Sequence, residues 1–410
     1  MATPFLLKYM KLPSLQTELQ KRARPIAFDP YRPFFVIGWG LAMAAVVPWL
    51  LLLYGFMETY PREMHADLMM GGFLMAFVMG FLGTALPRFT GTFGMERHEY
   101  YPLLLSLLCM PVAFVSRQGF YGVSICGMVS LLYFCVRRLK LRSSLPPPPF
   151  VFVIMGLMAS VVSLAVMSLQ ITAFETIASL YIYQGQQLLF VMGVGIFLIP
   201  NLLGHPGCMP PISHPLGARK SSNYLLSVPK PIWVISALFL SSFFLQGKGW
   251  VWQGILIRTS ILTLVAFRDW KIWRKPKVSS TLSYGLWLSC WFLVLGLWLQ
   301  LIFPALDIHN RHLIYIGGFG VMTFMIATRV TLAHGDHDMS LEKKSFGLKT
   351  VLFFLVLATV TRSIARLLPE VAYLDHLKYA AFSWIVALSI WGWVMIPKCL
   401  KSGRLYEKKL

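Results

Sequence analysis

The chain has 410 residues, of which 57% are hydrophobic and 13% charged, and its formal net charge is +21. Such an apolar composition excludes a soluble globular protein. A strong positive charge is also typical of nucleic-acid-binding proteins, but here the lysines and arginines lie between apolar runs, as membrane topology signals do. We therefore predict an integral membrane protein whose partner is the lipid bilayer, with no nucleic-acid partner.

Apolar runs close to the roughly 20 residues that a bilayer-crossing helix needs recur along the whole chain. They predict an all-α fold of about twelve transmembrane helices within a domain spanning 34–397. A basic segment, 1–33, precedes this domain, and a basic tail, 398–410, follows it. The runs lie, in chain order, near 34–56, 65–86, 101–117, 119–136, 150–170, 176–200, 231–247, 249–267, 281–303, 310–332, 349–366 and 376–397.

The distribution of basic residues fixes the expected orientation. The first thirty residues are basic and lack the apolar stretch of a cleavable signal, so we place the amino terminus in the cytoplasm. Roughly 28 of the 37 lysines and arginines then lie inside and about 7 outside, in agreement with the positive-inside rule. This count also places the carboxyl terminus in the cytoplasm. The inner basic segments lie near 8–24, 137–142, 219–230, 268–277 and 398–409.

Two histidines, His65 and His312, each open a glycine-rich apolar run, and each is followed by the triplet Gly-Gly-Phe. Both runs cross the membrane from outside to inside, so the two imidazoles are predicted at one depth near the outer boundary. His334 lies 22 residues beyond His312, roughly 33 Å along a helix, and therefore belongs to the opposite surface.

Two imidazoles at one depth are typical axial ligands of a low-spin haem. A macrocycle also needs helix faces of small residues, and the second run presents Met69 and Gly72 on the stripe that begins at His65. Its propionates need cations, and Arg62 and Arg311 stand just upstream of the two histidines. Interfacial polar residues, helix packing and snorkelling arginines would explain the same features without a cofactor, so both interpretations stay open.

A weak internal repeat links the second, sixth and tenth runs. The second ends Leu86-Pro87-Arg88-Phe89-Thr90-Gly91 and the sixth Ile199-Pro200-Asn201-Leu202-Leu203-Gly204. A recurrence every four helices suggests three four-helix units. Twelve helices, with a haem held by helices 2 and 10, also resemble subunit I of the haem-copper oxidases. The sixth run carries glutamines rather than histidines, so we predict no binuclear reductase centre of that kind.

Three segments of the chain resemble the NnrS family. The resemblance implies a bacterial inner-membrane protein of about twelve spans that carries haem, and also copper, and serves the response to nitric oxide. His65, His312 and His334 are the histidines that match, and so the expected metal ligands, while Asp67 stands where many members have a second histidine. The matching segments are Tyr31-Arg32-Pro33-Phe34-Phe35, His65-Ala66-Asp67-Leu68-Met69 with Gly80, Thr84-Ala85-Leu86-Pro87 and Thr90-Gly91, and His312 with Gly317, Gly320, Thr328-Arg329 and His334-Gly335.

We therefore expect a haem b protein of the nitrosative-stress response, with nitric oxide as a ligand and a membrane or periplasmic electron donor as a partner. The alternative is a cofactor-free secondary transporter, since twelve helices with a few buried charges are typical of that class too. Whether the protein is an enzyme is left open. So are the roles of Arg258, Arg329 and the three glutamines of the sixth run, Gln184, Gln186 and Gln187.

Overall fold

The computed structural model describes residues 29–205 and 224–401. Within these ranges, eleven helices are long and apolar enough to cross a membrane. The chain is therefore an all-α polytopic membrane protein, as predicted. Residues 1–28 and 402–410 of the predicted basic segments lie outside the described part. The spans are Tyr31–Leu53, Arg62–Thr90, Arg117–Lys140, Pro148–Ser168, Thr172–Leu202, Lys230–Gly247, Val251–Trp270, Thr281–Ile302, Pro304–His334, Phe346–Leu367 and Glu370–Leu400.

The third predicted span is shorter than the others. Its α-helix, α6 (Arg97–Cys109), has 13 residues and continues as a 3-10 segment, Met110–Phe114. An α-helix of that length covers about 20 Å, less than the roughly 30 Å of a hydrocarbon core. Pro111 ends the α-helix because it has no N–H to donate. The expectation of about twelve spans thus corresponds to eleven long helices and this shorter one among the described residues.

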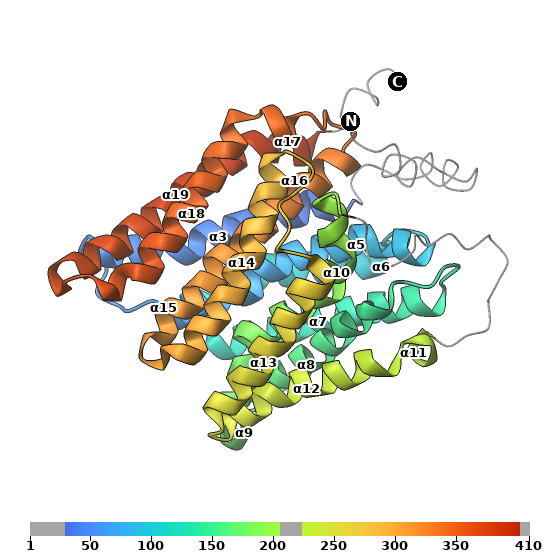
Figure 1. The fold of residues 1–410 in the computed structure, drawn as a ribbon, viewed down its shortest axis with the longest axis horizontal. Helices are drawn as coiled ribbons and strands as arrows, with labels where there is room; N and C mark the ends of the chain where they lie inside the picture. Colours follow the sequence, from blue (N-terminus) through green and yellow to red (C-terminus); the bar gives the residue numbers. More distant parts are fainter. Residues whose placement is uncertain (1–28, 206–223, 402–410) are drawn as a thin grey trace.

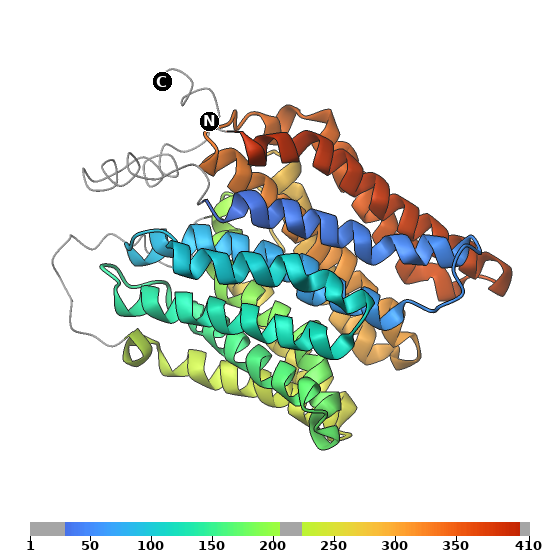
Figure 2. The ribbon, with the colours of Figure 1, turned by 180° about the vertical axis from the view of Figure 1, so that it is seen from behind.

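The first and last spans lie side by side, and the remaining helices form one bundle with them (Figures 1 and 2). Helix α3 (Tyr31–Leu53) runs along α19 (Glu370–Leu400). The Trp39 indole N–H donates to the Leu388 carbonyl at 2.8 Å, across 349 residues of sequence. The Arg32 guanidinium donates to the Cys399 carbonyl at 2.9 Å. The two ends of the transmembrane domain therefore close on each other.

Three spans contain a π-helical segment near the end at which they begin. The span from Arg62 contains the π-helical segment Leu68–Leu74, the span from Thr172 contains Tyr181–Gly185, and the span from Pro304 contains Leu313–Gly320. These are the second, sixth and tenth runs of the predicted repeat when α6 is counted as the third. They are called the second, sixth and tenth spans below. π-helical turns widen a helix locally and are frequent at functional sites.

The same three spans also end alike. Each reaches a residue with left-handed backbone, namely Gly91, Gly204 and Asp336, 23 positions beyond its first π-helical residue (68 to 91, 181 to 204, 313 to 336). The next residue then donates its N–H to a carbonyl five positions back, as helix C-caps do. The three spans thus share one plan, which supports the repeat inferred from sequence. These bonds are Thr92 to Pro87 at 2.8 Å, His205 to Pro200 at 2.9 Å and His337 to Leu332 at 3.0 Å.

The small residues of the second span pack against α3. A Cβ at Gly80 would lie 2.8 Å from the Phe35 ring, and one at Gly72 would lie 3.4 Å from Leu41. In return, a Cβ at Gly38 of α3 would lie 2.8 Å from the Phe77 ring. Close backbone approach is the usual function of small residues in membrane helices. Helix packing therefore accounts for this stripe.

A fully buried ion pair joins the short helix α6 to α7 (Arg117–Lys140). The Arg138 guanidinium donates to Glu99 at 2.5 and 3.1 Å, and neither side chain is exposed. Arg138 also packs its face on the Phe134 ring, 4.5 Å from the centroid. Removing one charge of such a pair leaves the other buried and uncompensated.

The substitution Glu99→Gln should lower the free energy of unfolding by about 3–5 kcal/mol, because Arg138 keeps its charge and loses its counterion. Thermal or denaturant unfolding of the detergent-solubilised protein measures this change. Glu96→Gln is the matched control: its half-exposed carboxylate pairs with Arg137, and its loss should cost about 1 kcal/mol or less. Equal costs for the two variants would contradict the analysis.

Candidate functional site

His65 is held in one orientation by the first span. It lies in the short helix α4 (Arg62–Asp67), and its Nδ1 lies 2.9 Å from the Ala45 carbonyl of α3. A carbonyl oxygen only accepts hydrogen bonds, so Nδ1 carries the proton and Nε2 keeps its lone pair. The Trp49 ring packs edge-on against the imidazole, 5.9 Å between centroids. In its neutral form, His65 therefore has the lone pair on Nε2.

His312 has the same arrangement. It ends the short helix α15 (Asp307–His312), and its Nδ1 lies 2.6 Å from the Ile308 carbonyl one turn earlier. The same argument puts the proton on Nδ1 and leaves the lone pair on Nε2. The ring is partly exposed, as is that of His65. A histidine whose Nδ1–H is held by a carbonyl is the usual state of an imidazole that ligates a metal through Nε2.

The two imidazoles lie near each other, and both lie within electrostatic range of the guanidinium of Arg362. Arg362 stands near the end of α18 (Phe346–Ile364), so three different helices contribute to this region. Sequence reasoning missed Arg362, because nothing in its local sequence separates it from any arginine at a helix end. The prediction that His65 and His312 share one end of the bundle fits these contacts.

His309, one turn before His312, is engaged differently. Its Nδ1 lies 2.9 Å from the Arg362 Nη1 and 3.2 Å from the Arg362 carbonyl oxygen. This nitrogen therefore faces both a donor and an acceptor of the same residue. His309 is also buried, with 4% of its surface exposed. Of the two histidines in α15, His312 is therefore the more exposed one.

The other predicted site residues are distributed around the two histidines. Arg311 pairs with Asp307 at 2.8 Å, whereas Arg62 is exposed at the start of α4. Met69 is partly buried one turn beyond His65, and Gly72 packs on α3. His334 lies at the far end of its span, with its ring 6.0 Å from that of Tyr31. The predicted separation of His334 from His312 is therefore present in the structure.

An aromatic layer joins the second and tenth spans beyond the histidines. The Phe73 ring stacks on Phe324 of α16 (Val321–His334) with 5.6 Å between centroids, and both pack edge-on against Trp384 of α19. The Trp384 indole donates to the Ala42 carbonyl of α3 at 3.5 Å. This layer fixes the relative positions of the helices that carry His65, His312 and the Ala45 carbonyl.

A buried carboxylate lies beside His65. The Asp67 side chain is 2% exposed and accepts from the Tyr183 hydroxyl at 2.5 Å and from Arg117 at 3.2 Å. Arg117 also donates to the Tyr183 oxygen at 3.0 Å and pairs with Glu63 at 2.8 Å. The network ties the π-helical turn of the sixth span to the start of the second.

Replacing Tyr183 by Phe should lower the free energy of unfolding by about 1.5–3 kcal/mol, because a buried carboxylate loses a charge-assisted hydrogen bond. In an Asp67→Leu background the same replacement should cost little, since the acceptor is already gone. Denaturant unfolding of the four proteins of this double-mutant cycle measures the coupling. Equal costs in both backgrounds would show that Tyr183 does not act through Asp67.

The three glutamines of the sixth span bind its neighbours. Gln184 donates to Gln300 of α14 (Thr281–Ile302) at 3.3 Å, and Gln186 accepts from Ser160 of α8 (Val151–Ser168) at 2.7 Å. Gln187 donates to the Met70 carbonyl of the second span at 3.4 Å. These polar groups therefore have interhelical contacts inside the hydrocarbon region.

Arg258 and Arg329, whose roles the sequence left open, also contact other side chains of the protein. Arg258 is fully buried in α13 (Val251–Val265); it donates to Gln246 at 2.6 Å and lies 4.1 Å from the centroid of the Phe243 ring. It thereby joins α13 to α12 (Lys230–Gly247). Arg329 pairs with Glu342 at 2.7 Å. Both guanidinium groups thus have polar or aromatic partners within the protein.

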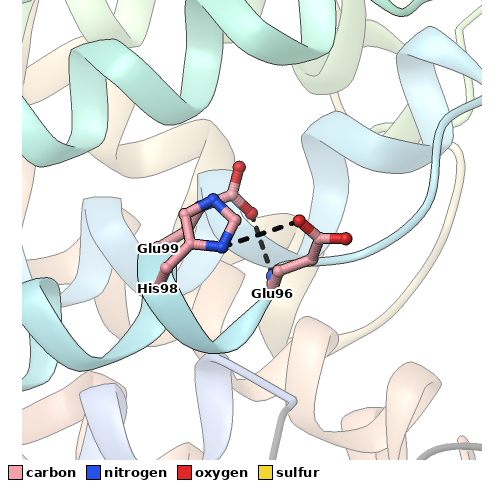
Figure 3. A group of neighbouring side chains, drawn as sticks. All are labelled: Glu96, His98 and Glu99. Carbon is pink, nitrogen blue, oxygen red and sulfur yellow. Dashed lines mark hydrogen bonds and ion pairs between the residues drawn. The ribbon is translucent and has the colours of Figure 1, made fainter.

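One cluster of metal-ligand side chains, Glu96, His98 and Glu99, stands at the start of α6 (Figure 3). Its carboxylates already have partners. Glu99 accepts from the Glu96 N–H at 2.9 Å in a capping box, and Arg137 donates to Glu96 at 2.5 Å and to Glu99 at 2.9 Å. The bond from Arg137 holds the pKa of Glu96 below its ordinary value. The cluster is therefore explained as a charge-paired helix cap.

The fold and the two imidazoles define a class: an all-α polytopic membrane protein with two neighbouring histidines, each bonded through Nδ1 to a backbone carbonyl. The family model described as NnrS protein matches residues 25–402, nearly the whole chain. The chain therefore belongs to the NnrS family and is a membrane protein of the nitric oxide response, as the sequence motifs suggested. A search of the curated proteins gave no match.

Proposed function

We propose that the protein binds haem b through His65 and His312 and uses it as a redox or nitric-oxide-responsive centre. The observation that carries the proposal is the common state of the two imidazoles. Each gives its Nδ1 proton to a backbone carbonyl, at 2.9 Å for His65 and 2.6 Å for His312. Each therefore keeps the Nε2 lone pair that an iron ligand requires.

The residues present fit such a group in charge as well as in donor chemistry. Two neutral imidazoles and the nearby Arg362 offer two nitrogen ligands and a cation for a propionate. A bis-histidine haem supplies one-electron transfer. Ala45 and Ile308 orient the rings, the aromatic layer of Phe73, Phe324 and Trp384 excludes water on one side, and Arg362 supplies positive charge. The proposal is confined to haem; copper stays an expectation of the family resemblance.

The proposal places the histidine end of the bundle at the outer face of a bacterial inner membrane. It rests on basic residues at described helix ends, since Arg137, Arg268 and Lys398 all lie at the ends opposite to α4 and α15. In this orientation both termini are cytoplasmic. An electron donor would then approach from the membrane or from the periplasm.

Replacing either His65 or His312 by Ala should abolish the sharp reduced α and β bands of the haem, because a single remaining imidazole cannot give a six-coordinate centre. The purified wild-type protein should show a Soret band with sharp reduced α and β bands, and pyridine-haemochrome analysis should give one haem b per chain. His98→Ala is the control, since His98 lies in the capped, charge-paired start of α6.

A colourless wild-type protein would overturn the proposal. Transport of a solute by such haem-free protein in liposomes would then support the alternative, a secondary transporter. A variant that lacks one of the two histidines but retains the full spectrum would instead leave the haem and reject the assigned ligand.

Replacing Arg362 by Gln should lower the midpoint potential of the haem by tens of millivolts. A fixed positive charge favours the reduced iron, which carries one positive charge fewer, so its removal favours the oxidised form. Spectroelectrochemical titration measures the shift. Lys349→Gln, at the other end of the same helix α18, removes the same charge and should leave the potential unchanged.

A further inference from the structure

A partly open cavity of about 120 Å³ lies between the second, sixth and tenth spans. The three spans of the repeat line it, each with one helix face. The second span contributes Leu74, Val78 and Phe81, and the tenth contributes Phe319, Met322 and Ile326. The sixth contributes Val191, Val194 and Leu198.

The lining is almost wholly apolar. Gln187 and Thr323 are the polar side chains among the lining residues. The Gln187 amide donates to the Met70 carbonyl at 3.4 Å, so its N–H is directed to a neighbouring helix. A buried water needs two to four polar partners, and the lining offers the side chains of Gln187 and Thr323 beside eighteen residues that are apolar or glycine. Most of the space therefore favours an apolar occupant.

The space is also too large to be ordinary packing. Its walls keep Val78, Val191 and Ile326 partly exposed although these side chains face the interior of the bundle. An apolar cavity of about 150 Å³ in another protein stays dry and binds benzene or xenon. The cavity here is of that order. It suits an uncharged apolar molecule with few atoms.

The cavity lies directly beyond the proposed haem ligand in the tenth span. Phe319 stands seven residues after His312, about 10 Å along a helix, and Ala327 stands about 22 Å away. A molecule in the cavity would therefore be separated from the histidine region by about two helical turns. Apolar gases partition into the hydrocarbon of a membrane, so lipid supplies such a molecule from the side.

We infer that this cavity is a binding site for a small uncharged apolar molecule of diatomic-gas size. On the proposed function, which this assignment of the occupant extends, that molecule is nitric oxide. The repeat then has a purpose beyond holding two histidines, since its three inner faces line the space in which the gas is concentrated.

Xenon is the direct probe, because it binds apolar cavities by dispersion alone. Crystals of the wild-type protein under xenon pressure should show an anomalous peak between Val191 and Phe319, and nitric oxide added with the xenon should lower its occupancy. In Val191→Phe the ring fills the space and the peak should be lost. Val162→Phe is the matched control, since Val162 is 64% exposed on α8, and it should keep the peak.

Absence of the xenon peak from the wild-type protein, or density for ordered water or a lipid acyl chain in its place, would overturn the inference. Xenon binding that nitric oxide does not reduce would reject nitric oxide as the occupant. The experiment repeated on the double variant His65→Ala/His312→Ala separates the two proposals. A haem-free protein that retains the xenon peak would leave the cavity site standing, whereas a haem-containing protein without the peak would leave only the haem.

Discussion

The hydrocarbon core of a membrane requires every backbone N–H and carbonyl to find a partner inside the protein, and this constraint governs the whole structure. It makes each span a helix. It also confines irregular backbone to places where other helices cover it. The π-helical turns of the second, sixth and tenth spans obey this limit, since they lie in the most buried of the membrane helices, each with 72% of its most apolar window inside the bundle. The site is built around these three turns.

The same constraint explains how the imidazoles are oriented. Inside an apolar bundle few acceptors are free, and the carbonyls of Ala45 and Ile308 serve His65 and His312. One carbonyl comes from a neighbouring helix and the other from the preceding turn of the same helix. The result is nevertheless the same tautomer. Carbonyls at two different positions in the backbone thus give the two histidines the same hydrogen-bonding state.

The sequence predicted the class of fold, the number of spans to within one, and the two histidines at one end, because hydropathy and basic residues report directly on membrane crossing. It also detected the repeat, through the Pro and Gly residues at the inner helix ends. Three features of the structure could not be predicted from the sequence. The proximity of Arg362 to both histidines depends on the tertiary fold. The network of Asp67, Tyr183 and Arg117 joins residues more than 100 positions apart in part. The central cavity arises from three faces that look, in sequence, like ordinary apolar stripes.

The pairing of α3 with α19 has a consequence for how the protein is made. The first span enters the membrane long before the last. The Trp39 indole is synthesised 349 residues before Leu388, whose carbonyl accepts its hydrogen bond. Until synthesis is complete, α3 presents this N–H and the Arg32 guanidinium to lipid or to a chaperone. The helix that supplies the Ala45 carbonyl therefore gains its final neighbour last. A chain released by a ribosome that stalls before α19 would lack the helix that pairs with α3. Membrane quality control would then recognise the unpaired face of α3.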